Sequence, residues 1–148
     1  MSRTPDVPVG LTEFVRDHCL CLHVQRAARA LARRFDEAFR PLGLTNGQFS
    51  LLMALNRGAP AGMGAVAALL AVDRTTLTAA LKPLERRGLV KVGADPSDRR
   101  SRLINLTAAG RRLLAQAVPI WKSAHGEVEG LVGALDADGL RQELRALS

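Results

Sequence analysis

Aromatic residues are scarce in this chain: they make up 3% of its 148 residues, and tyrosine is absent. This scarcity argues against a surface that stacks the bases of single-stranded nucleic acid on aromatic rings. The chain also lacks a Ser/His/Asp set, a phosphate-binding loop, a zinc-protease motif and paired carboxylates. We therefore expect no enzymatic activity.

Long apolar runs and a secretory leader are missing as well. No stretch is apolar for long enough to span a bilayer, and residues 1–11 lack the basic start and apolar segment of a signal peptide. Cys19 and Cys21 are the only cysteines, and on one helix they point to different sides and cannot easily form a disulfide. These features predict a cytoplasmic protein without a membrane partner or a cofactor.

The chain does carry a basic charge, and that charge is unevenly distributed. The formal net charge is +7, of which residues 1–71 contribute +3, residues 72–112 contribute +6 and residues 113–148 contribute −2. The cationic middle segment indicates an anionic partner. The length and an apolar fraction of 47% fit one folded domain over residues 1–148.

The N-terminal third of the chain predicts two helices. Residues 1–10, with two prolines and one glycine, predict a loose arm. Apolar residues at steps of three and four predict one long helix over residues 11–40. Thr45 and Gln48 then form a capping-box pattern, which predicts a second helix that stops at Gly58.

The middle of the chain predicts two short helices followed by a β-hairpin. The helices cover residues 64–70 and 74–87, and they are separated by a tight turn in which Asp73 caps the second helix. Alternating apolar residues predict strands over residues 89–93 and 102–106, with a longer polar turn between them. A helix–turn–helix followed by a hairpin is a winged helix–turn–helix.

The C-terminal part returns to helix. Thr107 caps a long helix that Pro119 should kink, and Asp136 caps a short final helix. Trp121 is expected in the core or in a dimer interface, and His125 in solvent. The fold class is therefore mainly α with a small β-hairpin wing. The terminal helices carry apolar residues that one small subunit leaves uncovered, which predicts an obligate homodimer.

One face of the predicted helix over residues 74–87 suits the major groove of DNA. At 100° per residue, its apolar side packs against the domain, and its opposite side carries hydroxyls, a small residue and cations but no acid. The apolar side comprises Leu77, Ala80, Leu81 and Leu84. The candidate DNA contacts are Arg74, Thr75, Thr76, Thr78, Ala79, Lys82 and Arg86. Such side chains can reach bases and phosphates, whereas the alternative is an ordinary amphipathic surface helix.

The hairpin tip is rich in arginine. Its candidate DNA contacts are Asp98, Arg99, Arg100 and Arg102. A narrow minor groove attracts inserted arginine, and Asp98 could orient the Arg100 guanidinium through a bidentate pair. The alternative is a charged turn that only faces solvent.

Three segments resemble the MarR family of bacterial transcription regulators. They are LTNGQFSLLMAL at residues 44–55, VDRTTLTAALKPLERRGLVKV at residues 72–92 and DPSDRRSRLINLTAAG at residues 95–110, the last with the wing signature Asp98-Arg99-Arg100. The resemblance extends from about residue 12 to 147. Two features depart from it: tyrosine is absent, and Met63 stands where members often place Thr or Ser to cap a helix.

The resemblance implies a sequence-specific regulator that binds double-stranded DNA, as a repressor released by a small-molecule effector. It implies a single MarR-type domain with a winged-helix lobe over about residues 45–107 and dimerisation helices over about residues 11–40 and 108–147. The homodimer would place recognition helices in successive major grooves of a palindromic operator and wing arginines in the flanking minor groove. A small aromatic or anionic effector, bound by unassigned residues, would lie between the dimerisation helices and the lobe.

The segment His18-Cys19-Leu20-Cys21-Leu22-His23 leaves two alternatives open. A redox-responsive regulator would use Cys21 or Cys19. Cys21 lies where the resemblance places the reactive cysteine of peroxide-sensing members, although the tyrosines that support that thiol are missing. A metal-responsive regulator would use the pairs Cys19/His23 and His18/Cys21, which supply only two ligands each, so we assign no metal site.

Two further interpretations complete the set. Both cysteines could simply be small packing residues of an apolar helix. The winged helix could also bind proteins instead of DNA, an alternative that the cationic face of the predicted recognition helix argues against.

Overall fold

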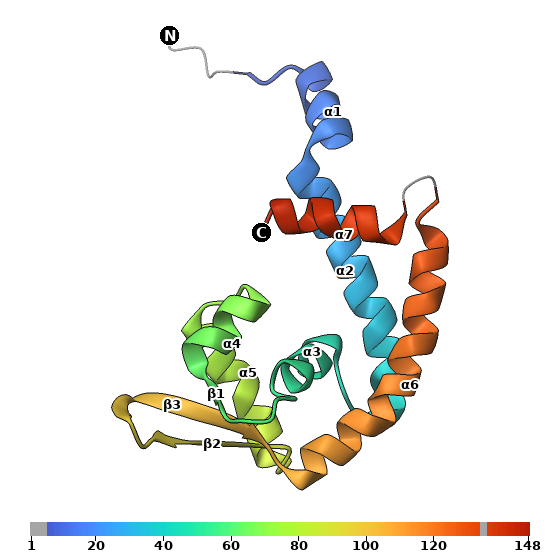
Figure 1. Ribbon diagram of the computed structural model, residues 1–148. Helices are drawn as coiled ribbons and strands as arrows, with labels where there is room; N and C mark the ends of the chain where they lie inside the picture. Colours follow the sequence, from blue (N-terminus) through green and yellow to red (C-terminus); the bar gives the residue numbers. More distant parts are fainter. Residues whose placement is uncertain (1–5, 134–135) are drawn as a thin grey trace.

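The computed structural model describes residues 6–133 and 136–148 and arranges them as helices beside a small sheet (Figure 1). The helices are α1 (Val9–His18), α2 (Leu20–Phe39), α3 (Asn46–Ala54), α4 (Met63–Leu70), α5 (Arg74–Arg86), α6 (Ala108–Leu131) and α7 (Ala137–Ala146), with a 3-10 turn, η1 (Arg40–Leu42), after α2. The strands are β1 (Ala61–Gly62), β2 (Val90–Asp95) and β3 (Asp98–Leu106). This arrangement confirms the predicted fold class.

The N-terminal helix is broken, and the prediction of one continuous helix is wrong. Cys19 is extended, with φ −70° and ψ 108°, and it ends α1 and precedes α2. The ring nitrogens Nδ1 of His18 and His23 donate to the carbonyls of Phe14 and Cys19, at 2.9 and 2.8 Å. No Pro or Gly marks the break, so the sequence carried no breaker signal.

The predicted loose arm is partly wrong. Val9 and Gly10 already belong to α1. Residues 1–5 of the predicted arm lie outside the described residues.

Side-chain caps begin three of the helices in and around the winged lobe. Thr45 and Gln48 form the predicted capping box of α3, in which the Gln48 amide donates to Thr45 Oγ1 at 3.2 Å. Asp73 Oδ1 accepts from the Thr76 amide at 2.6 Å and caps α5. Thr107 caps α6 in the same way. Gly62 precedes α4 without a side-chain cap, as expected from Met63 at its first position.

The two short helices meet at the angle of a helix–turn–helix. The axes of α4 and α5 differ by 101° across the turn at residues 71–73, and Ala71 takes the left-handed conformation there with φ 53°. Among the described helices, no single one is long and apolar enough to cross a membrane; only this bent pair reaches the required apolar length. The bend is the ordinary geometry of the motif.

The wing is a three-stranded sheet and not only a hairpin. The strand order is β1-β3-β2, with Val92 opposite Ile104 and Ala61 on the other side of Ile104. The predicted hairpin is confirmed, but its strands are longer and its turn shorter than expected. Asp95 Oδ1 accepts from the amide and the hydroxyl of Ser97, at 2.9 and 2.6 Å, which closes the turn and lowers the pKa of Asp95.

The core lies beneath the helix–turn–helix and continues into the long helices. Phe39, Leu52, Val66 and Leu84 are fully buried, and no charged or polar residue of the described chain is buried. Phe39 stacks on Phe49 with ring centroids 4.7 Å apart, and Trp121 lies 6.4 Å from Phe49. These rings connect α2, α3 and α6, so the lobe shares its core with two flanking helices.

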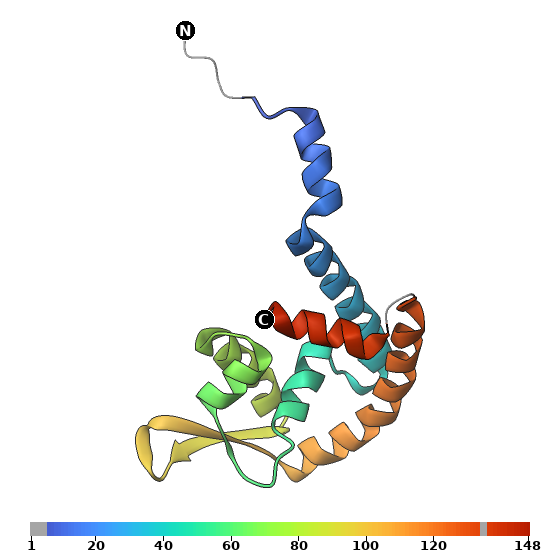
Figure 2. The same cartoon turned by 45° about the horizontal axis from the view of Figure 1, so that its top comes forward.

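Helix α6 curves along its length, which contains Pro119, and leads to α7 (Figures 1 and 2). Near its start, Gly110 lies so close to the backbone that an added Cβ would sit 2.1 Å from Leu89 O. Trp121 is half-buried, in agreement with its expected packing role. The expectation that His125 lies in solvent is wrong: His125 is half-buried, and its ring stacks on that of Trp121 with centroids 4.5 Å apart.

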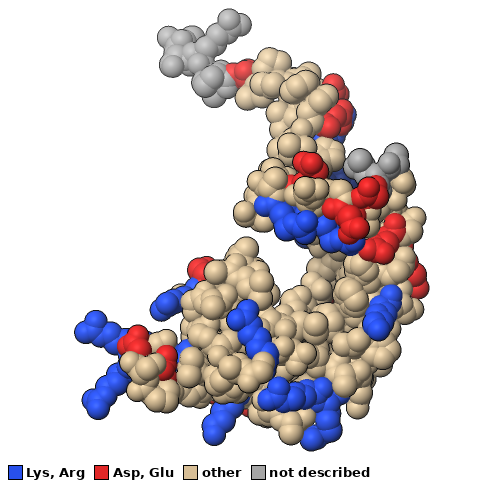
Figure 3. Space-filling model, viewed as in Figure 1, with Lys and Arg blue, Asp and Glu red and all other residues tan. Residues whose placement is uncertain are grey.

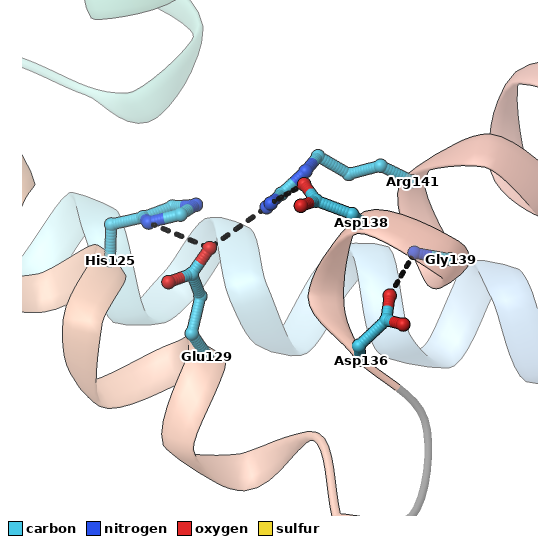
Figure 4. Close-up of polar contacts among 6 residues, drawn as sticks. All are labelled: His125, Glu129, Asp136, Asp138, Gly139 and Arg141. Atoms are coloured by element: carbon cyan, nitrogen blue, oxygen red, sulfur yellow. Dashed lines mark hydrogen bonds and ion pairs between the residues drawn. The ribbon is translucent and has the colours of Figure 1, made fainter.

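A polar network joins the end of α6 to α7 (Figure 4). Arg141 donates to Glu129 at 2.9 Å and to Asp138 at 2.6 Å, and His125 lies 3.7 Å from Glu129. Arg141 lowers the pKa of Asp138 through its hydrogen bond and its charge. Asp136 caps α7 through the Gly139 amide, as predicted.

Candidate nucleic-acid interface

Helix α5 presents a polar face to solvent and buries the opposite face. Leu77, Leu81 and Leu84 are buried, which agrees with the helical pattern. Ala80 is exposed, so its predicted place on the buried side is wrong; its Cβ lies at the edge of the apolar stripe. All seven candidate contacts of this helix are exposed: Arg74, Thr75, Thr76, Thr78, Ala79, Lys82 and Arg86.

Three of these side chains lie against other parts of the helix–turn–helix. Thr78 Oγ1 donates to the Arg74 carbonyl at 2.8 Å, which leaves its lone pairs free to accept from a base amino group. Thr76 lowers the pKa of Asp73, first through its amide, which donates to the carboxylate, and then through its hydroxyl. The Arg74 guanidinium lies beside Gly64, 3.3 Å from where a Cβ of Gly64 would sit.

A shallow groove joins α5 to the wing. Its volume is about 280 Å³, and its lining is Met63, Thr78, Leu81, Lys82, Glu85, Val92 and Arg102. Three predicted contacts, Thr78, Lys82 and Arg102, therefore come together from two separate elements. Glu85 also lies in this groove and was missed by the sequence analysis. A carboxylate here can accept from a cytosine amino group or repel a phosphate.

Further arginines lie on the wing beside this groove. Arg100 and Arg102 are two positions apart on β3 and share one face of the strand, and both are exposed, as is Arg99. The predicted Asp98–Arg100 ion pair is wrong: Asp98 Oδ1 instead accepts from the Arg100 amide at 3.0 Å. Asp98 therefore shapes the backbone at the tip of the wing and leaves the guanidinium free to turn outward.

Basic side chains project from the wing and the lower side of the lobe in Figure 3, with acidic ones at the wing tip. Arg86, near the end of α5, is exposed and has no hydrogen bond or ion pair within the described residues. Its neighbour Arg87 differs, because it donates to the carbonyls of Gly43 and Leu42. No signal in the sequence separated these two adjacent arginines.

The two cysteines lie at the break between α1 and α2. Cys19 is half-buried, Cys21 is exposed, and both thiols are free. Gln25 Nε2 donates to Cys21 Sγ at 3.2 Å. No three His, Cys, Asp or Glu side chains gather as a metal site in residues 6–133 and 136–148, so the cysteine–histidine pairs of this segment gain no third ligand there.

An apolar cavity lies between the lobe and α6. Its volume is about 510 Å³, and its lining is Phe49, Ser50, Met53, Ala54, Leu69, Leu70, Val118 and Trp121. Two aromatic rings and a single hydroxyl line it, and no cation does. Such a lining suits a flat apolar molecule better than a small anion.

Known proteins are similar to this chain in both sequence and fold. A model of the MarR family matches residues 42–101. The M. tuberculosis transcriptional regulator MosR, in a crystal structure with DNA, is 42% identical, and the alignment covers 88% of this chain and 93% of MosR with a TM-score of 0.80. The chain belongs to the MarR family. Members of this family are transcription regulators and not enzymes, which confirms the expectation of no enzymatic activity.

Two further relatives, a repressor and an activator by their names, are similar to this chain over most of its length. CouR, a transcriptional repressor whose structure was solved with a 23-mer DNA duplex, is 29% identical, with 97% of this chain and 99% of CouR covered and a TM-score of 0.79. The transcriptional activatory protein BadR of Rhodopseudomonas palustris is 37% identical over 75% of this chain. The matched part spans 66% of BadR, and about half of several other curated relatives.

Proposed function

We propose that this MarR-family chain is a dimeric transcription regulator that binds double-stranded operator DNA through α5 and the wing. The observation that carries the proposal is the groove in which Thr78 and Lys82 of α5 meet Arg102 of β3. A helix with small and hydroxylated side chains suits the major groove, and arginines on a projecting hairpin suit the adjacent minor groove. The MosR and CouR crystal structures with DNA support this assignment.

The cations supply affinity that depends on salt. Each neutralised phosphate releases condensed counterions and contributes roughly −0.9 to the slope of log K against log salt concentration. A homodimer doubles every contact, because the same side chains act at both half-sites of a palindrome. The exposed apolar residues on α1, α2 and α7 support such a dimer, since nothing within the described chain covers them.

The cavity beside Trp121 is the proposed effector site, and its lining favours an aromatic effector over a small anion. CouR of Rhodococcus jostii RHA1 has been crystallised with p-coumaroyl-CoA, an aromatic acyl thioester. Occupancy would displace α6 relative to α3 and α4, and release of DNA by this displacement is the proposed repressor mechanism. Trp121 is the only tryptophan, so p-coumaroyl-CoA binding should quench its fluorescence, and Ser50→Leu, which narrows the cavity and removes its one hydroxyl, should weaken the quench.

A direct test of DNA binding uses the promoter duplex beside the gene of this protein. Fluorescence anisotropy over a salt series should give tight binding, and Arg100→Ala should lower the slope by about two units in the dimer. Arg29→Ala, an exposed arginine of α2, is the matched control and should leave the slope unchanged. An unchanged slope in Arg100→Ala would show that Arg100 of the wing contacts no phosphate. Absence of DNA binding by the wild type would favour a protein-interaction role.

A thiol-responsive regulator is the second candidate, and the break at Cys19 supports it. An extended Cys19 frees the two thiols from the fixed helical geometry that would keep them apart. Peroxide would oxidise one thiol to a sulfenic acid, and the second thiol would then displace water to form a disulfide. Peroxide should weaken operator binding by the wild type but not by Cys21→Ser. Equal losses in both proteins would reject the candidate.

A further inference from the structure

Arg87 joins the C-terminal end of α5 to a turn that is distant in the sequence. Its Nη1 donates to the Gly43 carbonyl at 2.8 Å and its Nη2 to the Leu42 carbonyl at 3.3 Å. These carbonyls belong to the end of η1, which continues directly from α2. Arg87 lies roughly 100–140° around the helix from Thr75, Lys82 and Arg86. This arginine therefore links the proposed recognition helix to α2.

The two carbonyls are suited to a guanidinium. The last carbonyls of a helix have no partner within the helix, and a guanidinium offers several donors in a fixed planar fork. Gly43 has φ +63°, and a Cβ there would lie 3.7 Å from Nη2 of Arg87, so the glycine turn accepts the guanidinium closely. A lysine in place of Arg87 could donate to one of these carbonyls but could not reproduce the fork.

A second polar link reinforces the same corner of the molecule. Asp36, in the last turns of α2, accepts from the Asn46 amide at the start of α3 through Oδ1, at 2.6 Å. The corner between α2 and the lobe is thus fastened at the first residue of α3 and at the residue that follows α5. The aromatic stack of Phe39 on Phe49 fills the space between these helices.

We propose that Arg87 is a positioning residue that sets the inclination of α5 relative to α2. This proposal rests on the proposed function, in which α5 enters the major groove of a palindromic operator. Helix α2 runs from the lobe toward the exposed terminal helices (Figure 1). If those helices form the dimer, a rigid connection between α2 and α5 fixes the position of each α5 relative to its partner. The distance between two recognition helices decides which half-site spacing can bind. Arg87 therefore selects operator spacing without contacting DNA.

The test compares Arg87→Ala with Arg86→Ala on operators whose central spacer is unchanged or altered by one or two base pairs. Arg87→Ala removes two charge-assisted hydrogen bonds that hold α5 at its inclination. Binding must then fix that inclination, so this variant should bind the natural spacing about tenfold more weakly. Its salt slope should equal that of the wild type, and its preference for the natural spacing should fall severalfold. Arg86→Ala should lower the slope by up to two units and keep the spacing preference.

A second measurement needs no DNA and reports the joint itself. A spin label at Ala80→Cys, exposed on α5, in a Cys19→Ser/Cys21→Ser background gives the distance between the two α5 helices of the dimer. Arg87→Ala should broaden this distance distribution, and Arg86→Ala should not. If Arg87→Ala fails to fold, Arg87→Lys replaces it and should broaden the distribution to a smaller extent.

The outcomes separate this proposal from the proposed function. A wild-type protein that binds no duplex would overturn the DNA-binding function and the role of Arg87 with it. Binding by the wild type with an unchanged spacing preference and distance distribution in the Arg87 variants would overturn only the positioning role. A salt slope reduced by about two units in Arg87→Ala would show that Arg87 contacts phosphate, and this would also overturn the positioning role.

Discussion

The lobe and the terminal helices bury their apolar side chains to very different extents. Four of the nine residues of α3 are buried, whereas α1 and α7 contain no buried residue. The exposed apolar residues outside the lobe include Val9, Leu11, Phe14, Val15, Leu20, Val24, Leu31, Leu131, Leu144 and Leu147. This contrast supports the proposed dimer, in which a second copy of the chain would cover the apolar side chains of the terminal helices.

The largest expected effect is on dimerisation, from substitutions on the apolar face of α1. Leu11→Ser/Phe14→Ser should raise the dissociation constant of the dimer by at least about 100-fold, because four apolar side chains leave each dimer interface and each contributes roughly 1.5–3 kcal/mol when buried. Sedimentation equilibrium measures this constant. Glu13→Ser/Arg16→Ser, on the opposite side of the same helix, is the matched control and should leave the dimer intact. A double variant that remains a stable dimer would place the interface elsewhere.

A smaller change should follow from altering the joint between the lobe and α6. Gly110→Ala places a Cβ 2.1 Å from the Leu89 carbonyl, in a position enclosed by backbone, and should destabilise the fold by about 1–3 kcal/mol or more. Urea unfolding measures the change. Gly47→Ala, in α3 with no atom within 4 Å of the added Cβ, should be neutral or slightly stabilising. Similar losses of stability in the two variants would show that the close approach at Gly110 has little importance.

Of the three changes, loss of the Asp73 cap of α5 should have the smallest effect on stability. Because the pKa of Asp73 is lowered in the folded protein, the cap stabilises fully above the ordinary carboxyl pKa near 4 and is lost as pH falls through the folded value. The difference in Tm between the wild type and Asp73→Ala should therefore shrink as pH falls below about 4. Asp6→Ala, which changes an exposed acid outside the helices, should show no such trend. A constant difference down to about pH 2 would contradict the cap.

Much of the lobe could be predicted from the sequence because its signals are local. Thr45, Asp73 and Thr107 each cap the helix that follows them, since a hydroxyl or carboxylate reaches the amide three residues ahead. Leucines at helical spacing correctly placed the buried side of α5. These rules need only a few neighbouring residues, which a single sequence supplies.

The features that were missed depend on partners distant in the sequence. Strand β1 has two residues and exists only because Ile104 and Leu103 pair with it. Arg87 and Arg86 are chemically identical, and only the position of Gly43 in space separates their contacts. The break at Cys19 carries no Pro or Gly. The apolar residues on both sides of it keep the spacing of one continuous helix, so their pattern does not reveal the break.

Removing equal charge from two regions decides whether α5 and the wing form a specific DNA surface. Lys82→Ala/Arg86→Ala/Arg100→Ala removes three cations from α5 and the wing, and Arg26→Ala/Arg29→Ala/Arg33→Ala removes three from exposed positions of α2. If these three cations contact phosphates in a dimer as proposed, the first variant would lose six contacts and should lower the salt slope of operator binding by about five units, and the second should leave the slope near the wild-type value. Equal reductions in the two variants would mean that binding follows net charge and that α5 and the wing form no such surface.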